Sequence, residues 1–219
     1  MRDVYLFDLD GTLIDRRPSL EAFLPKQYAR YRTLDLPVDL FVERFFSLDK
    51  DGHAPKHDLY QTLADEFNLA ASGTELVADF RANAFAACAL QPGALAVLEQ
   101  LRRRGVRLGV VTNGSVAAQQ QKLDASGIAP YLETCVISEA VGLRKPDPAL
   151  FLVATSRLGV EPEACVFVGD HLEKDIVGAQ RAGMRTVWLR HGRAWPERLR
   201  PPPTLEVSRL MELLALPTR

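Results

Sequence analysis

The chain has 219 residues, of which 47% are hydrophobic and 25% are charged, and its formal net charge at pH 7 is -1. Such a composition is ordinary for a folded globular protein, and it lacks the basic excess that drives non-specific binding to nucleic acid or anionic lipid. The short apolar run near the N-terminus ends in carboxylates, so it matches neither a signal peptide nor a membrane span. We therefore expect a cytoplasmic protein without nucleic-acid or membrane partners, and leave open whether it is a monomer or a homodimer.

The first expected element is a buried strand at residues 4–7, which leads into Asp8, Asp10 and Gly11. Side chains at i and i+2 of an extended chain share a face, so the two carboxylates point the same way. Their repulsion requires a divalent cation, a shared proton or solvent. Taken alone, this stretch is equally compatible with a strand that ends in a simple Asp-Gly turn.

Residues 16–88 show a different pattern, with apolar side chains at helical spacing and many aromatic residues. The spacing predicts amphipathic helices at residues 19–31, 39–46, 57–67 and 74–87. We interpret this region as a separate all-helical domain that is inserted into the remainder of the chain.

From residue 91 onward, predicted helices alternate with short apolar strands. Strands are expected at residues 106–111, 134–137, 164–168 and 185–189, helices at 94–104, 116–125, 148–158 and 174–182, and a closing helix at 205–216. This alternation predicts an α/β domain with a doubly wound parallel sheet covered on both faces, to which the first strand also belongs. The expected core comprises residues 1–15 and 89–219.

Polar side chains follow the strands of this predicted sheet, at the edge where open parallel sheets bind their ligands. The set comprises Asp8, Asp10, Thr112, Asn113, Gly114, Lys145, Asp170 and Asp175. Taken singly, each residue could have a purely structural role, because small polar and acidic residues often cap helices and a lone lysine is often a solvated charge. Together they bring acids, a hydroxyl group and an ammonium group to one edge of the sheet.

Four motifs, in this order, resemble those of the haloacid dehalogenase superfamily of phosphohydrolases: Asp8-Leu9-Asp10-Gly11-Thr12, Thr112-Asn113-Gly114, Lys145-Pro146, and Gly169-Asp170 with Asp175. The resemblance covers nearly the whole chain, and the helical insertion is similar to the small cap of one branch of the family. It implies a Rossmann-like core with a helical cap domain. The implied activity is Mg²⁺-dependent hydrolysis of small phosphate monoesters, such as nucleoside monophosphates, sugar phosphates or phosphoglycolate, through an aspartyl-phosphate intermediate.

The resemblance also implies roles for individual residues. Asp8 is the expected nucleophile, and Asp10 the acid that protonates the leaving oxygen and later activates water. Thr112, Lys145 and the amide groups of Asn113 and Gly114 are expected to bind and neutralise the phosphoryl oxygens.

The metal ligands implied by the resemblance are Asp8, Asp10 through its backbone carbonyl, and Asp170, a hard oxygen set that suits Mg²⁺. Asp175 is expected behind them, where it steadies Lys145 or a metal-bound water.

Asp10 separates the reactions of the family. Its dehalogenase members typically lack an aspartate two residues after the nucleophile, so hydrolysis of a phosphate ester fits this chain better than 2-haloacid dehalogenation. A sugar-phosphate mutase keeps the same aspartates and remains an alternative, as does a catalytically idle relative that binds a phosphorylated ligand or a protein. Substrate selectivity is expected in the cap, with hinges at residues 15–18 and 90–93.

Overall fold

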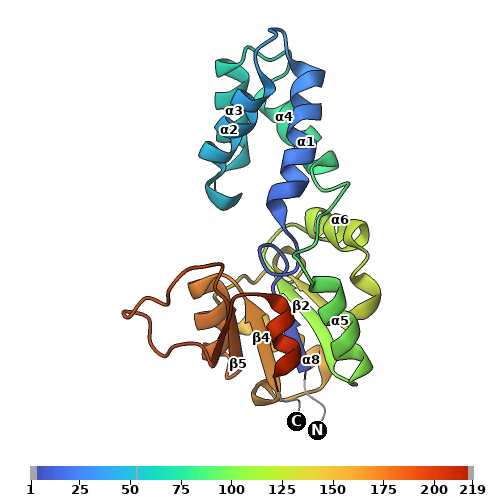
Figure 1. Cartoon of the computed structure of the whole chain (residues 1–219), viewed down its shortest axis with the longest axis vertical. Coiled ribbons are helices and arrows are strands. Elements are labelled where there is room, and N and C mark those ends of the chain that lie inside the picture. Colours follow the sequence, from blue (N-terminus) through green and yellow to red (C-terminus); the bar gives the residue numbers. More distant parts are fainter. Residues whose placement is uncertain (1–3, 53, 217–219) are drawn as a thin grey trace. The chain divides into compact units, whose positions relative to one another are not determined.

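The computed structural model describes residues 4–52 and 54–216, and the chain divides into two compact units (Figure 1). The first unit consists of Met1–Asp15 and Ala89–Arg219, and the second of Arg16–Cys88. The chain leaves the first unit at Asp15 and re-enters it at Ala89, where the Asp15 amide donates to the Ala89 carbonyl at 2.9 Å. The two connecting segments therefore lie side by side.

Within the described residues, the first unit contains a six-stranded parallel sheet in the order β3-β2-β1-β4-β5-β6 (Figure 1). The strands are β1 Val4–Phe7, β2 Arg107–Thr112, β3 Thr134–Ile137, β4 Cys165–Gly169, β5 Arg185–Leu189 and β6 Leu205–Val207. The central strand β1 places Val4 opposite Arg107 on one side and Cys165 on the other. The predicted doubly wound α/β fold is confirmed.

Helices cover both faces of this sheet. They are α5 Ala94–Arg103, α6 Val116–Ser126, α7 Ser138–Val141, α8 Pro148–Leu158 and α9 Gly178–Arg181, with short 3₁₀ turns at Ala129–Tyr131 and Pro162–Ala164. Val4 and Leu6 of β1 pack in one cluster with apolar side chains of α8 and α9. Tyr5 and Phe7 alternate to the opposite face and are buried as well. Burial on both faces explains why every residue of β1 is apolar.

The predicted helix at residues 174–182 is present, but its first part is not α-helical. A wide π-type turn, Leu172–Val177, precedes the short helix α9. In this turn the Ile176 amide reaches back five residues to the His171 carbonyl, at 3.3 Å. Asp175 thereby turns fully inward and lies so close to Gly169 that a Cβ on that glycine would come within 2.4 Å of the Asp175 Cβ. Such turns in helices often accompany functional sites.

The predicted closing helix at residues 205–216 is wrong. Residues Leu205–Val207 form β6, which pairs with β5, and a 3₁₀ helix follows at Leu210–Ala215. The Arg190 amide continues the ladder by donating to the Val207 carbonyl at 3.0 Å. A three-residue strand is too short to show a period, so the apolar side chains of this segment resembled one helical face.

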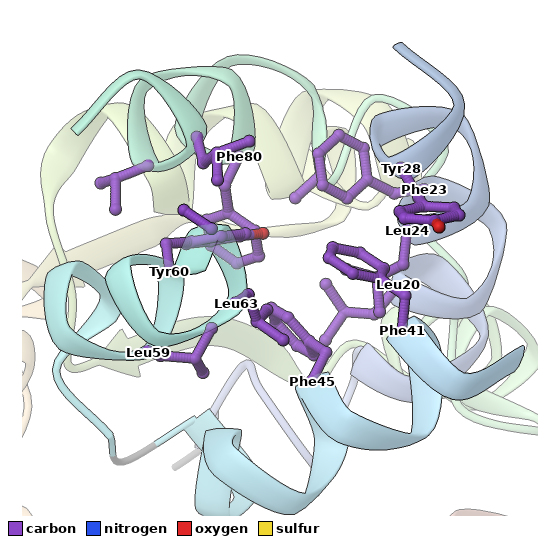
Figure 2. Close-up of a cluster of buried hydrophobic side chains, with 14 of the residues drawn as sticks. Leu20, Phe23, Leu24, Tyr28, Phe41, Phe45, Leu59, Tyr60, Leu63 and Phe80 are labelled. Carbon is purple, nitrogen blue, oxygen red and sulfur yellow. The ribbon is translucent and has the colours of Figure 1, made fainter. Parts of the chain in front are cut away.

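The second unit is all-helical and has its own core. Its elements are α1 Arg16–Tyr31, α2 Val38–Asp49, a 3₁₀ turn at Lys50–Gly52, α3 Lys56–Glu66 and α4 Gly73–Asn83. Figure 2 shows leucine and aromatic side chains of these helices converging, and the rings of Tyr28 and Phe41 stack with centroids 5.0 Å apart. The fourth helix ends at Asn83, four residues before the expected end.

A small polar network crosses this aromatic core. The Tyr60 hydroxyl donates to Gln27 Oε1 at 2.8 Å, and Gln27 Nε2 donates to Asp79 Oδ2 at 3.1 Å. Gln27 and Tyr60 are fully buried, so these bonds replace the water that both side chains lose. Across the described parts of both units, no helix is both long and apolar enough to cross a membrane.

Candidate active site

The site is built on the carboxyl end of β1. Asp8 directly follows this strand, and its amide continues the sheet by donating to the Val168 carbonyl at 2.9 Å. Its side chain is nearly buried, and Lys145 Nζ donates to Asp8 Oδ1 at 2.5 Å. The same ammonium group donates to Asp175 Oδ1 at 2.6 Å. One buried lysine therefore bridges two of the predicted aspartates.

Asn113 explains how Lys145 is held in this position. Asn113 Oδ1 accepts from the Lys145 amide at 2.8 Å, and Asn113 Nδ2 donates to the Lys145 carbonyl at 3.1 Å. The asparagine after β2 thus clamps the backbone of the loop after β3. Its side chain is occupied by this clamp, which leaves its backbone amide as the group expected to bind a phosphoryl oxygen.

Burial and neighbouring charges shift the pKa values of these groups. Burial raises the pKa of the Asp8 carboxyl well above its usual value, and Asp175 raises it further, while Lys145 opposes both. The pKa of Asp170 is raised by burial and then by Asp175. Burial alone would lower the pKa of Lys145, but Asp175 and Asp8 outweigh it and the pKa rises. Lys145 is therefore an ammonium, and the carboxylates around it still lack positive charge.

Asp170 follows β4 and completes a group of three acids. One carboxylate oxygen each from Asp8, Asp170 and Asp175 lies within 4.8 Å of the others. Gly11, at φ +87°, approaches so closely that a Cβ there would come within 2.8 Å of Asp170 Oδ1. The carboxylate oxygens cluster, and the pKa values of Asp8 and Asp170 are raised. Such oxygens are the donor set of a hard divalent cation, so the residues present fit Mg²⁺.

Asp170 is also held by side chains that the sequence did not point to. Trp188 Nε1 donates to its carbonyl at 2.9 Å, and Arg193 donates to the same carbonyl at 2.7 Å and to Asp170 Oδ2 at 3.4 Å. His191 Nε2 lies 2.7 Å from the Gly11 carbonyl. His191 and Arg193 come from the loop after β5, and no motif or period marked them.

The side chain of Asp10 contacts α6 and is not part of the three-acid group. Lys122 Nζ donates to both Asp10 oxygens at 2.7 Å, and Gln119 Nε2 donates to Asp10 Oδ2 at 3.0 Å. Both partners come from α6 and were missed. Gln119 and Lys122 share one face of this helix, but so do other polar residues of α6, such as Gln121 and Asp124.

Thr112 and Gly114 lie at the end of β2, as expected. Thr112 is buried, and its Oγ1 accepts from Gln119 Nε2 at 2.6 Å. The Gly114 amide donates to Ser138 Oγ at 3.0 Å, so it would have to exchange that partner to bind a phosphoryl oxygen. All eight predicted residues thus lie at the carboxyl ends of the strands or in the segments that follow them, and their roles stay predictions.

Comparison with known proteins relates the sequence to a family and to named relatives. Residues 3–183 match the model of the haloacid dehalogenase-like hydrolases. A glyceraldehyde 3-phosphate phosphatase of Methanopyrus kandleri is 45% identical over 126 residues, 56% of this chain and 54% of that protein, and one of Pyrococcus abyssi is 32% identical over 199 residues, 88% and 83%. The chain thus spans about half the length of the first of these relatives.

Among solved structures, the HAD-hydrolase YfnB from Bacillus subtilis, described as bound to magnesium, superimposes with a TM-score of 0.78 at 25% identity, covering 98% of this chain and 97% of that one. A match over both nearly complete chains extends the similarity to the helical unit as well as the sheet. The sequence motifs and the fold therefore indicate the same relationship to known proteins.

Proposed function

We propose that this chain, which belongs to the haloacid dehalogenase-like hydrolase family, hydrolyses phosphate monoesters of small metabolites with Asp8 as its nucleophile. The observation that carries the proposal is the environment of Asp8, a buried carboxylate that holds one ammonium group and lies within 4.8 Å of two further acids. The named relatives act on glyceraldehyde 3-phosphate, which supports a small phosphorylated substrate.

In the first step, an Asp8 oxygen attacks phosphorus and the bond to the leaving oxygen breaks, which forms an aspartyl phosphate. Asp10 gives its proton to the leaving oxygen. In the second step, Asp10 takes a proton from water, the water oxygen attacks phosphorus, and the Asp8 carboxylate and inorganic phosphate are released. Lys145 stabilises the negative charge that gathers on the phosphoryl oxygens, together with the Thr112 hydroxyl and the amides after β2.

Asp8 and Asp170 would hold Mg²⁺, with the Asp10 backbone carbonyl, and Asp175 would keep Lys145 in place. Bound there, the ion would supply positive charge against the phosphoryl group. The carboxyl pKa values of Asp8 and Asp170 support this assignment, because burial and the neighbouring Asp175 raise both despite the presence of Lys145. The description of YfnB as bound to magnesium supports the choice of ion.

The helical unit Arg16–Cys88 is proposed to act as the cap that selects the substrate, with the connecting segments around Asp15 and Ala89 as its hinges. The groups that the described part of the sheet unit gathers at its site suit a phosphoryl group and a cation. Selection of the remainder of the substrate therefore needs side chains from elsewhere in the chain.

The test is phosphate release from glyceraldehyde 3-phosphate, phosphoglycolate, phosphoserine, nucleoside monophosphates and sugar phosphates, with Mg²⁺ and with EDTA. Wild-type protein should release phosphate only with Mg²⁺, and Asp8→Asn should abolish release. Asp124→Asn, which changes an exposed carboxyl on α6, is the matched control and should retain full activity. Normal turnover by Asp8→Asn would refute the nucleophile assignment.

Asp10→Asn separates the acid role from a purely structural one. We expect a large loss with alkyl phosphates, on the order of 10²–10⁴-fold, as is typical for loss of a general acid or base. The loss should be smaller with p-nitrophenyl phosphate, whose leaving group needs no proton. An equal loss with both esters would contradict the assignment.

A further inference from the structure

A buried network links Asp10 to α6. Lys122 and Gln119 are 6% and 2% exposed, although lysine and glutamine usually lie at the surface. Lys122 Nζ contacts both Asp10 oxygens at 2.7 Å and donates to Gln119 Oε1 at 2.8 Å. Burying an ammonium group costs free energy unless charge and hydrogen bonds compensate it, and this set of acceptors does so.

Gln119 extends the network to Thr112. Its Nε2 donates to Thr112 Oγ1 at 2.6 Å and to Asp10 Oδ2 at 3.0 Å, while its Oε1 accepts from Lys122. The glutamine amide therefore uses both of its donors and its acceptor within the network. Because Thr112 Oγ1 accepts from Gln119, its hydroxyl proton donates elsewhere, here to the Asn113 carbonyl at 3.5 Å, a long hydrogen bond that a phosphoryl oxygen could replace.

We propose that Lys122 and Gln119 are positioning residues: Lys122 fixes the Asp10 carboxylate for proton transfer, and Gln119 couples Asp10 to the phosphoryl-binding Thr112. The proposal rests on the proposed function, because it takes Asp10 as the acid and Thr112 as a phosphoryl-binding group. The new element of the proposal is that side chains of α6 hold Asp10 and Thr112 in position. In this mechanism Asp10 acts first on the leaving-group oxygen and then on the water oxygen, so its carboxylate needs a fixed orientation. Misplacement by about 1 Å can cost on the order of 10²-fold in rate.

Because Lys122 and Gln119 contact different groups, their substitutions should change different kinetic parameters. Lys122 holds the Asp10 carboxylate, whereas Thr112 accepts its hydrogen bond from Gln119. Lys122→Met should therefore reduce kcat for alkyl phosphates and leave inhibition by inorganic phosphate at its wild-type strength. Gln119 contacts both Asp10 and Thr112, so Gln119→Leu should reduce kcat and also weaken inhibition by inorganic phosphate. A purely structural role would not separate these effects.

The experiment measures kcat and KM of the full chain with Mg²⁺ on glycerol phosphate and on p-nitrophenyl phosphate. For Lys122→Met we expect the loss in kcat with glycerol phosphate to exceed that with p-nitrophenyl phosphate by roughly tenfold or more, within the range that acid-base catalysis supplies. Lys122→Arg should restore most of the activity, because a guanidinium group can also donate two parallel bonds to a carboxylate.

Gln120→Leu is the matched control for Gln119→Leu, since Gln120 is the next residue on α6 and is exposed. Arg103→Met, which removes an exposed positive charge on α5 of the sheet unit, is the control for loss of a positive charge. Neither should change kcat. Should Lys122→Met fail to fold, Lys122→Gln keeps a hydrogen-bond donor without the charge and should show the same dependence on the leaving group.

The outcomes are distinct. An equal loss with both esters, or no loss, in folded Lys122 variants of an active enzyme would overturn the positioning role. Gln119→Leu with unchanged phosphate inhibition would overturn the coupling to Thr112. A folded wild-type protein that releases phosphate from neither these esters nor the metabolite panel would refute the proposed function, and the roles of Lys122 and Gln119 with it.

Discussion

Replacing Lys145 by Met should destabilise the metal-free protein strongly. The Lys145 side chain is 2% exposed and bridges Asp8 and Asp175, whose side chains are 9% and 1% exposed. Removing one partner of a buried ion pair leaves uncompensated charge and costs about 3–5 kcal/mol. For a chain of this length, each kcal/mol shifts Tm by about 2–4 °C, so the melting temperature should fall by roughly 6–20 °C.

The assay is thermal and urea denaturation in EDTA, followed by circular dichroism. Lys145 opposes the rise in the pKa values of the Asp8 and Asp170 carboxyls, so its removal should raise both further. The folded state of the variant then binds more protons than the unfolded state, and its stability should fall as pH rises above about 4, the ordinary carboxyl pKa. Lys26→Met, an exposed charge loss, should stay within about 0.5 kcal/mol of wild type. A Lys145→Met protein as stable as that control at pH 8 would refute the reasoning.

Other outcomes follow from the same contacts. Mg²⁺ should bind more weakly as pH falls, because burial and Asp175 raise the pKa values of the Asp8 and Asp170 carboxyls and protons then compete with the metal; calorimetric titration at two pH values measures this. Removing the half-exposed Arg193 beside Asp170, as Arg193→Gln, should tighten Mg²⁺ binding severalfold in low salt, and looser binding would contradict it. In the helical unit, Gln27→Leu should cost about 1–3 kcal/mol in urea denaturation, since it leaves the buried Tyr60 hydroxyl without its acceptor.

The sheet and the predicted residues could be read from the sequence because their signals are local. A strand buried on both faces is a continuous apolar run, and the polar residues that end it follow directly in the chain. Asp8 after β1 and Asp170 after β4 are examples. Since parallel strands bring their carboxyl ends to one edge, chain order alone places these residues near one another.

The wrong and missed parts depend on packing between distant segments. The close approach of Gly169 to Asp175, with a π-type turn in place of a regular helix, is a property of the folded loop after β4. The strand β6 forms through pairing with β5, which three residues of sequence do not reveal. Lys122 could have been found only by knowing which face of α6 meets the sheet.

The distribution of fixed positive charge indicates where the proposed cation would find a carboxylate. Lys145 forms ion pairs with Asp8 and Asp175, and Lys122 of α6 forms one with Asp10. Both ammonium groups are nearly buried. Asp170 is different, because its cation is the half-exposed Arg193, at 3.4 Å. Exposed ion pairs contribute little and exchange readily, whereas buried ones are costly to break. Asp170 therefore has the most exposed ion-pair partner of these acids, and a divalent cation can most easily replace that partner.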